Sequence, residues 1–328
     1  MAEVGCAGIL VSDTFCGPMQ ELPREGQLLA VDDLPTKAGG CAANVAIDLS
    51  KQGVGVDIAG CLGNDPSARV LLASLEQHQV GCGRIVYSDS LATSKTVILL
   101  VAGQDRRYIH AFGANAAFSV AHIDLDWVKS LKVLYLGGLF LMPAFHIPEL
   151  LTLLEFCRAH QVTTVIDVVV PQNAQVTADL APLLQLTDYF LPNEDEGYLL
   201  TGLKDPQDQL RAFLRMGAKT VFVTLGRNGI LAGQGQRRWQ AGIYDMELVD
   251  PTGSGDAFAS GVVLGALRGW DMPTTIRYAS ALGASAIHAL GTTDGVFTAA
   301  QAEAFLASHP LDVRVSEAGQ SGGRTGEA

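Results

Sequence analysis

The feature of this sequence that most constrains its fold is the alternation of short apolar runs with longer amphipathic stretches. Stretches of helical pattern lie at 41–53, 67–79, 147–160 and 208–217. Runs with the length of buried strands lie at 4–11, 56–63, 132–138, 163–170, 188–193 and 220–226. Continuous apolar strands that alternate with helices are typical of a parallel sheet covered on both faces. We therefore predict an α/β fold with a mostly parallel central sheet between two helical layers.

Two segments interrupt this alternation. Residues 14–37 carry three prolines and no convincing helical pattern, and residues 94–112 have the pattern of a β-hairpin that turns at 103–105. We predict that they form a small β-sheet over one edge of the main domain, as a lid; two ordinary surface insertions are the alternative. Residues 1–313 then form one domain. The polar, Gly-rich segment 314–328 is predicted to be a disordered tail.

The composition limits the classes of partner. Of 328 residues, 48% are hydrophobic, and 22 basic against 34 acidic side chains give a net charge of −12 without a basic cluster. This argues against nucleic acid, although a locally positive site can still bind an anion. No apolar run approaches the roughly 20 residues that cross a bilayer, and no signal peptide opens the chain. The six cysteines form no Cys-x-x-Cys pair, so we expect free thiols in a cytoplasmic protein.

The segment DPTGSGDAF, residues 250–258, places small residues between two carboxylates. It follows a strand-like stretch at 244–250 and precedes a helical pattern at 256–270. The first turn of a helix presents unpaired N–H groups and a positive dipole end, which together bind anions. Gly253, Ser254 and Gly255 would let phosphate oxygens approach these N–H groups. We therefore predict that the three residues form an anion hole.

Asp256 then lies beside the predicted anion hole. Phosphoryl transfer needs a base for the attacking hydroxyl and donors for the charge on the transferring group. Asp256 can supply the base, while the alternative is an ordinary helix-capping aspartate. The chain contains no Walker A sequence, so a P-loop does not explain the glycines.

At this point the sequence resembles a known family. DPTGSGDAFASG is similar to the C-terminal signature, D-T-x-G-A-G-D, of the ribokinase-like (PfkB) carbohydrate kinases. Further stretches match the same family in the same order: GILVSD (8–13), AGGCAANVA (38–46), GANAAF (113–118), LPNEDE (191–196) and VTLGRNG (223–229). The resemblance covers roughly residues 4–312 and implies a three-layer α/β/α sandwich with a β-sheet lid, which often also forms the dimer contact.

The resemblance also implies the roles of individual residues. Asp256 is expected to be the catalytic base beside Gly253, Ser254 and Gly255. The sugar-binding residues would be Asp13, Gly39, Gly40 and Asn44. The nucleotide-binding residues would be Asn193, Thr224, Gly226 and Gly229. Glu196 would place Mg²⁺ indirectly, and Asp250 and Thr252 would help to hold a monovalent cation, commonly K⁺, with carbonyls near 286–292.

The predicted function is ATP-dependent phosphorylation of a sugar hydroxyl with Mg²⁺, in a kinase that can form a lid-mediated homodimer. Two departures argue against a true ribokinase: Cys41 replaces a lysine, and the strand end at Gly137–Gly138 lacks an acidic residue. A nucleoside kinase of the same family and a catalytically silent sugar or nucleotide sensor are the alternatives. Arg106 and Arg107 would contact a second phosphate on the substrate, or else are solvated charges at a hairpin end. The identity of the sugar is left open.

Overall fold

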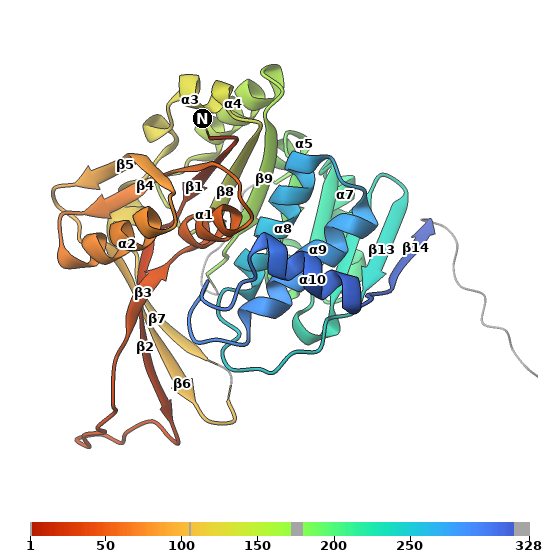
Figure 1. The fold of residues 1–328 in the computed structure, drawn as a ribbon. Coiled ribbons are helices and arrows are strands. Elements are labelled where there is room, and N and C mark those ends of the chain that lie inside the picture. The colour runs from red at the N-terminus through yellow and green to blue at the C-terminus, as the bar shows by residue number, and fades with distance from the viewer. Residues whose placement is uncertain (1, 105, 172–179, 318–328) are drawn as a thin grey trace, which may run out of the picture.

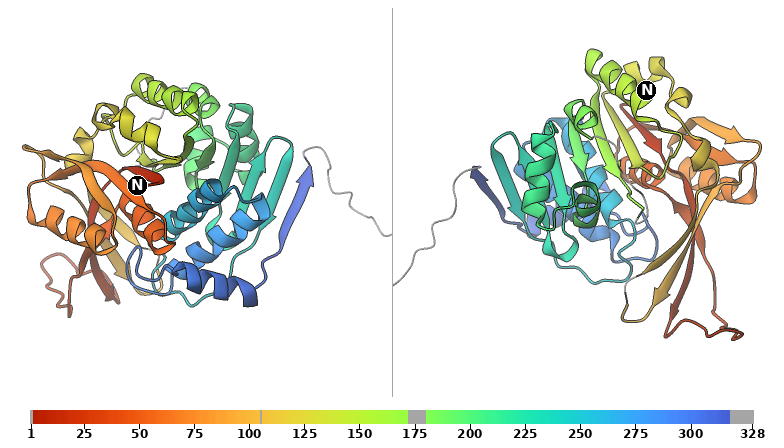
Figure 2. Two further views of the ribbon diagram at one scale, coloured as in Figure 1. Left: turned by 45° about the horizontal axis from the view of Figure 1, so that its top comes forward. Right: turned by 180° about the vertical axis from the view of Figure 1, so that it is seen from behind.

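The protein is described by a computed structural model that covers residues 2–104, 106–171 and 180–317. It consists of a large body and a small sheet that projects from it (Figures 1 and 2). Within the described ranges, no helix is long and apolar enough to cross a membrane. Segments 172–179 and 318–328 lie outside these ranges, and so does Asp105 in the predicted hairpin turn.

The body is built on a sheet of ten strands in the order β14-β13-β12-β11-β10-β9-β8-β1-β4-β5. Its parallel strands are β1 (Val4–Gly8), β4 (Val56–Gly63), β5 (Gly81–Ser88), β8 (Val133–Leu139), β9 (Thr163–Val168), β10 (Tyr189–Leu191) and β11 (Thr220–Thr224). Three antiparallel strands complete one edge: β12 (Ile230–Gln234), β13 (Arg237–Ala241) and β14 (Val313–Glu317). The predicted α/β fold with a mostly parallel sheet is therefore confirmed.

Helices cover both faces of this sheet, as the continuous apolar strands require (Figure 2). One layer comprises α1 (Cys41–Lys51), α2 (Pro66–Gln77), α8 (Ser254–Arg268), α9 (Met272–Ala286) and α10 (Ala299–Ser308). The other comprises α3 (Leu125–Ser130), α4 (Ile147–Ala159), α5 (Ala181–Gln185), α6 (Glu194–Thr201) and α7 (Pro206–Arg215). Each layer buries its own cluster of apolar side chains against the sheet.

The small sheet has four strands in the order β3-β2-β6-β7. They are β2 (Val11–Met19), β3 (Thr36–Gly39), β6 (Ser94–Val101) and β7 (Arg107–Ala111). The two segments that interrupt the alternation thus pair with each other, and β6 and β7 form the predicted antiparallel hairpin. We call this sheet the lid.

Three sequence predictions need correction. The apolar run 4–11 is divided between β1 and β2, because Gly8 has φ +151° and approaches the backbone of Gly137 too closely for a side chain. The lid therefore begins at Val11, before Asp13. The stretch 244–250 is no strand, because β14 occupies the position beside β13. Residues 314–317, assigned to the tail, belong to β14.

Candidate active site

The segment 250–256 forms a tight turn into helix α8. The Asp250 carboxylate accepts hydrogen bonds from the backbone N–H and hydroxyl of Thr252, at 3.0 and 2.6 Å. Gly253 caps the helix in the left-handed conformation, with φ +83°. A Cβ at Gly253 would lie 2.1 Å from the carbonyl oxygen of Thr292, whereas a Cβ at Gly255 would meet nothing within 4 Å. The first turn of α8 therefore faces open space, as an anion-binding helix end requires.

Asp256 lies in this first turn and is held by residues of α1. Asn44 donates a hydrogen bond from Nδ2 to Asp256 Oδ2 at 2.7 Å. The Asn44 amide oxygen in turn accepts from the hydroxyl of Thr292 at 2.8 Å. Burial raises the pKa of Asp256 above that of an ordinary aspartate, while hydrogen bonds from Asn44 and Cys41 counteract this rise. A carboxylate fixed in orientation and made more basic is suited to accept a proton.

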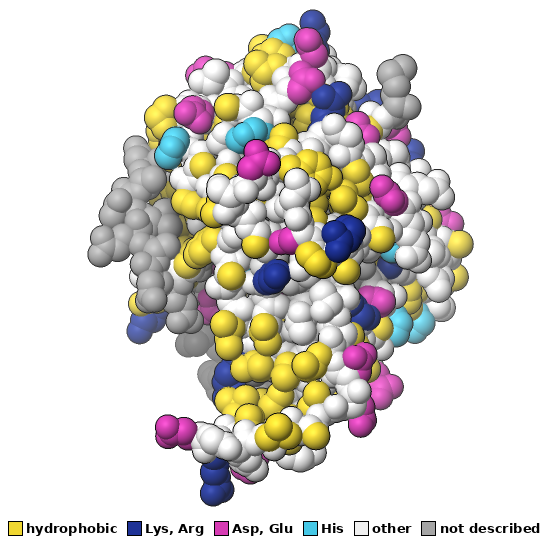
Figure 3. All heavy atoms as spheres, turned by 90° about the vertical axis from the view of Figure 1, so that its left-hand side faces the viewer, with side chains coloured by type: hydrophobic (Ala, Val, Ile, Leu, Met, Phe, Trp, Pro, Cys, Tyr) yellow, Lys and Arg dark blue, Asp and Glu magenta, His cyan; other side chains and the backbone are white. Residues whose placement is uncertain are grey.

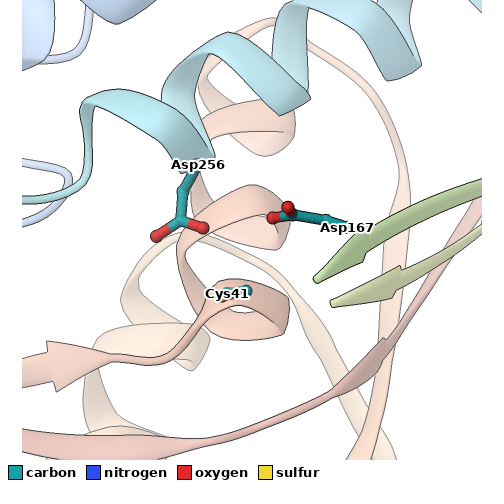
Figure 4. Close-up of side chains that lie close together, drawn as sticks. All are labelled: Cys41, Asp167 and Asp256. Carbon is teal, nitrogen blue, oxygen red and sulfur yellow. The ribbon is translucent and has the colours of Figure 1, made fainter. Parts of the chain in front are cut away.

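A second carboxylate, Asp167 at the end of β9, faces Asp256 (Figure 4). Ligand atoms of Cys41, Asp167 and Asp256 all lie within 4.8 Å of one another. The hydroxyl of Tyr135 donates to Asp167 at 2.8 Å. Burial, the charge of Asp256 and that of Glu196 raise the pKa of Asp167 well above its usual range. Asp167 was not among the predicted site residues, although an acid in the apolar run TTVIDVVV is the signal that marks it.

The predicted sugar-binding residues meet where the lid joins the body. Asp13 lies inside β2, and Gly39 ends β3 at the start of α1. A Cβ on Gly39 would lie 1.8 Å from Asp13 Oδ2, so glycine lets the carboxylate approach the backbone. Gly40, with φ +91°, caps α1. Burial, together with the charges of Asp256 and Asp250, raises the pKa of Asp13 to about 7, although a hydrogen bond from Thr96 lowers it.

The predicted nucleotide-binding residues lie at the carboxyl ends of neighbouring strands. Asn193, after β10, forms a parallel bridge with Thr224 at the end of β11. Asn193 also caps α6, and its backbone N–H donates to Glu196 at 2.9 Å. Burial raises the pKa of Glu196 to about 8, and the charges of Asp195 and Asp256 contribute. Gly226 and Gly229 form the turn between β11 and β12, both with positive φ.

A loop at 287–297 forms hydrogen bonds both with the turn before α8 and with β3 and α1 in the N-terminal part of the chain. Asp250 Oδ2 accepts from the backbone N–H of Gly291 at 3.1 Å. The ammonium of Lys37, on β3, donates to the carbonyl of Leu290 at 2.7 Å and pairs with Asp294 at 3.2 Å. Lys51, on α1, donates to the carbonyl of Thr293. This loop is therefore held between the root of the lid and the anion-binding turn.

Other predicted residues stay outside this cluster. Arg106 donates to the hydroxyl of Tyr108 and lies over its ring, and Arg107 donates to Gln104. Both arginines are thus engaged at the hairpin end. His288, for which no role was predicted, donates a hydrogen bond from Nδ1 to the carbonyl of Ser285 and lies near Phe297.

Comparison with known proteins gives the same assignment as the motifs. The model of the pfkB family carbohydrate kinases matches residues 1–299. The chain belongs to the pfkB family. It is 27% identical over 301 residues to 2-dehydro-3-deoxygluconokinase of Bacillus subtilis, covering 86% of this chain and 90% of that one. It is 26% identical over 263 residues to ATP-dependent 6-phosphofructokinase of Thermoanaerobacterium thermosaccharolyticum, covering 77% and 80%.

Solved structures share the pfkB fold. Ribokinase of Arabidopsis thaliana, complexed with ribose and ATP, superposes with a TM-score of 0.80 at 22% identity, covering 93% of this chain and 99% of that one. A putative ribokinase II of E. coli, complexed with ATP and Mg²⁺, gives 0.79 at 22% identity, covering 94% and 100%. The predicted fold is therefore confirmed. Family membership also confirms that the protein is a carbohydrate kinase that uses ATP.

Proposed function

We propose that the protein transfers the γ-phosphoryl group of ATP to a hydroxyl group of a sugar bound between the body and the lid. The observation that carries this proposal is the position of Asp256 in the first turn of α8, with Asn44 donating to its carboxylate at 2.7 Å. A base and the N–H donors of the anion hole then lie on one helical turn. Phosphoryl transfer needs this combination.

In the proposed mechanism, Asp256 accepts the proton of the sugar hydroxyl as the oxygen attacks the γ-phosphorus in line. The bond from phosphorus to the β,γ-bridging oxygen breaks, and ADP leaves with the electron pair. Backbone N–H groups at Gly253, Ser254 and Gly255 stabilise the charge on the transferring group. Asn44 keeps the carboxylate aimed at the hydroxyl. The proton on Asp256 returns to solvent after the sugar phosphate leaves.

Mg²⁺ is proposed to accompany ATP. Carboxylate oxygens are the ligands that Mg²⁺ prefers, and Asp167 and Glu196 supply two carboxylates whose charges interact with each other and with Asp256. Burial raises the pKa of both groups, so a cation that offsets their charge fits this site. Asp167 and Glu196 would hold the ion directly or through water. Its chemistry would be to neutralise phosphate charge.

The remaining roles follow the family resemblance and the geometry. We propose that Asp13, with the backbone at Gly39 and Gly40, binds sugar hydroxyls, and that Asn44 acts mainly by orienting Asp256. For the nucleotide we propose four residues at the carboxyl ends of β10 and β11: Asn193, Thr224, Gly226 and Gly229.

K⁺ is proposed as an accessory ion. Asp250 and Thr252 with backbone carbonyls form an oxygen-rich donor set, which suits a monovalent cation. Three donors already satisfy the Asp250 carboxylate, however, and Lys37 already occupies the carbonyl of Leu290. We therefore expect K⁺ to assist activity without being essential.

The assembly and the location of the protein are further proposals. Hydrophobic side chains gather on the lid side of the molecule (Figure 3). Val97 and Ile109 face each other across β6 and β7 and are 36% and 63% exposed. Such a face supports a homodimer through the lid, which light scattering would detect as twice the mass of one chain. All six cysteines are free thiols, which supports a cytoplasmic location.

The alternatives lack a specific observation in their favour. A silent sensor would not need a base hydrogen-bonded beside an anion hole, and the described residues supply both. A nucleoside kinase would need an aromatic platform for the base. Of the three aromatic candidates in the lid region, Phe15 is fully buried, the ring of Tyr108 is covered by Arg106, and the ring of Phe112 packs edge-on against His110.

The test is release of ADP from Mg-ATP in the presence of individual sugars and nucleosides. We expect turnover on a sugar and loss of roughly a thousandfold in kcat for Asp256→Asn. Turnover that survives this substitution would remove Asp256 from the mechanism. Turnover on nucleosides only would mean that the protein is a nucleoside kinase and does not phosphorylate a sugar.

A further inference from the structure

One row of polar side chains crosses the face of the lid that is turned towards the body. In the register of the lid, Lys37 on β3 pairs with Asp13 on β2, Asp13 pairs with Thr96 on β6, and Thr96 pairs with His110 on β7. Residues directly opposite each other in a sheet point to the same face. Lys37 contacts the body loop, and Asp13 lies in the field of Asp256. The row therefore faces the proposed sugar site.

Hydrogen bonds along this row fix the tautomer of His110 when Asp13 is ionised. Above its pKa of about 7, Asp13 is ionised and can only accept, so the Thr96 hydroxyl donates to it, in keeping with the lowering effect of Thr96 on that pKa. The Thr96 oxygen lies 3.1 Å from His110 Nδ1, and it can then only accept from that nitrogen. Burial lowers the pKa of His110, which favours the neutral ring. With the proton on Nδ1, Nε2 carries a lone pair.

This lone pair has no partner in the part of the chain that the structure describes. His110 Nε2 is buried and accepts no hydrogen bond from any described residue. A buried acceptor without a donor costs free energy comparable to a lost hydrogen bond. A ligand hydroxyl that donates to Nε2 would recover this free energy when the sugar binds.

Three cations near this row are engaged elsewhere, and Arg106, four residues before His110, donates to the hydroxyl of Tyr108 and lies over its ring. The ammonium of Lys37 is directed to Leu290 and Asp294. Arg107 pairs with Leu99 and, by alternation along β7, lies on the opposite face from His110. It is also three residues away, roughly 10 Å along the strand. The row thus offers acceptors, Asp13 and His110, to whatever binds beneath it.

We propose that His110 is a specificity-determining residue that accepts a hydrogen bond from a hydroxyl of an uncharged polyol sugar, and that the lid disfavours sugars bearing phosphate or carboxylate beneath this row. This inference rests on the proposed function and specifies its substrate class. The relatives' names include both a 6-phosphofructokinase and a 2-dehydro-3-deoxygluconokinase, so the comparisons do not decide the charge of the substrate.

Binding of sugars without catalysis separates the two proposals. Isothermal titration of the full-length Asp256→Asn variant would compare fructose with fructose 6-phosphate, ribose with ribose 5-phosphate, and glucose with gluconate. We expect the tightest ligand to be uncharged, by tenfold or more over its charged counterpart. Preference for a charged ligand, or no binding of any of these sugars, would overturn the inference. Absence of turnover by the wild-type enzyme, with uncharged sugars still bound, would count against the kinase mechanism alone.

Substitution of His110 then tests the residue itself. His110→Phe keeps a planar ring but removes the acceptor, and we expect affinity and kcat/KM for the best uncharged sugar to fall about tenfold to a hundredfold. The loss caused by His110→Phe should be smaller for the deoxy analogue that lacks the recognised hydroxyl. His110→Gln should recover part of the affinity and kcat/KM that His110→Phe loses. Arg107→Ala, on the other face of the same strand, is the matched control and should change neither value by more than about twofold. An unchanged His110→Phe variant, or equal losses on the sugar and all its deoxy analogues, would overturn the assignment.

Discussion

The body and the lid of this kinase are built from different sequence patterns and do different work. Strands of the body are buried on both faces, since every residue of β1 and of β8 is buried. Strands of the lid alternate, and β6 exposes Lys95 and Val97 while it buries Thr96 and Ile98. A strand with two faces can present one of them to a ligand and the other to solvent or a partner. We therefore propose that the body holds the phosphoryl-transfer chemistry and that the lid contacts the substrate.

The largest expected effect tests whether the chemistry belongs to the body. Gly253→Ala would force a side chain onto a left-handed residue and against Thr292, so we expect loss of at least about 2 kcal/mol of unfolding free energy together with the activity. Gly255→Ala would place its methyl group in open space at the first turn of α8. We expect it to keep its stability and lose roughly tenfold or more in kcat/KM for ATP, because phosphate is proposed to fill that space.

Urea unfolding and steady-state kinetics of the two alanine variants would measure these effects. Two results would contradict the assignment of the anion hole: a Gly255→Ala enzyme with normal kinetics, or a Gly253→Ala enzyme with normal stability. The first would place the phosphate elsewhere in the body. The second would mean that the turn can adjust to a side chain.

This difference between the body and the lid also decided what the sequence could predict. Strands with one continuous apolar run were located to within a few residues, since β4 at Val56–Gly63 coincides with the predicted run. The lid strand β2 was not separated from β1, because only the backbone approach of Gly8 to Gly137 marks the break. Gly253, Gly255 and Asp256 lie in one contiguous motif, so they could be predicted from the sequence alone.

Contacts between distant segments could not be predicted. Asp167 faces Asp256 across 89 positions of the chain, and nothing in its own run of residues specifies that neighbour. The amide of Asn44 is similar: its residue type fits both a sugar ligand and a helix cap, and only the fold brings it to Asp256. The row from Lys37 to His110 depends on the register of four strands, which alternating patterns alone leave open.

The second effect concerns α1, which joins the lid to the base. Asn44→Leu would remove the hydrogen bond that lowers the pKa of Asp256. Because the base works only when ionised, a higher pKa moves the acid limb of kcat/KM to higher pH. We expect a shift of about 1 pH unit and a fall of roughly tenfold to a hundredfold in kcat.

The pH dependence of kcat/KM from pH 5 to pH 9 would measure this shift. Asn44→Asp offers a comparison, since a second carboxylate beside Asp256 should raise its pKa further. An acid limb that stays in place in Asn44→Leu would mean that Asn44 contacts the sugar and does not tune the base.

The third effect concerns Asp48, an acidic residue within the otherwise apolar core of the body. Asp48 is fully buried in α1, and both carboxylate oxygens lack a hydrogen-bond partner within the described residues. Burial raises its pKa well above the usual value, although Lys51 counteracts this. An aspartate with a raised pKa makes its full contribution to stability at pH values below the pKa that it has in the unfolded chain. This contribution is lost as the pH rises towards the pKa that it has in the folded protein, because the unfolded chain releases the proton first.

Asp48→Asn keeps the shape and removes the titration. We expect the difference in unfolding free energy, variant minus wild type, to increase by about 1 kcal/mol or more when the pH is raised from 5 to 8. Denaturant unfolding at both pH values would measure the difference. An equal effect of the substitution at both pH values would mean that Asp48 is ionised in the folded body and paired.

The smallest expected effect concerns the tie between lid and body at Lys37. Its ammonium holds the carbonyl of Leu290 at 2.7 Å, next to Gly291, whose N–H donates to Asp250. The Lys37 ammonium orders backbone oxygens of this loop beside the buried Asp250. This is part of the role that we propose for K⁺. Replacing K⁺ by tetramethylammonium should therefore lower wild-type kcat less than about threefold, because one charge-assisted hydrogen bond already fixes the loop.

Lys37→Met would remove that bond while keeping most of the apolar stem. We expect the variant to depend on K⁺ by roughly threefold to tenfold and to show a larger rise of its unfolding temperature with added K⁺ than wild type does. The exposed ion pair with Asp294 contributes little, so Asp294→Asn is the matched control and should behave as wild type. Equal K⁺ responses of Lys37→Met and wild type would mean that the lysine does not affect the cation site. The contact between lid and body would then be the one from the Thr292 hydroxyl to the Ala38 carbonyl.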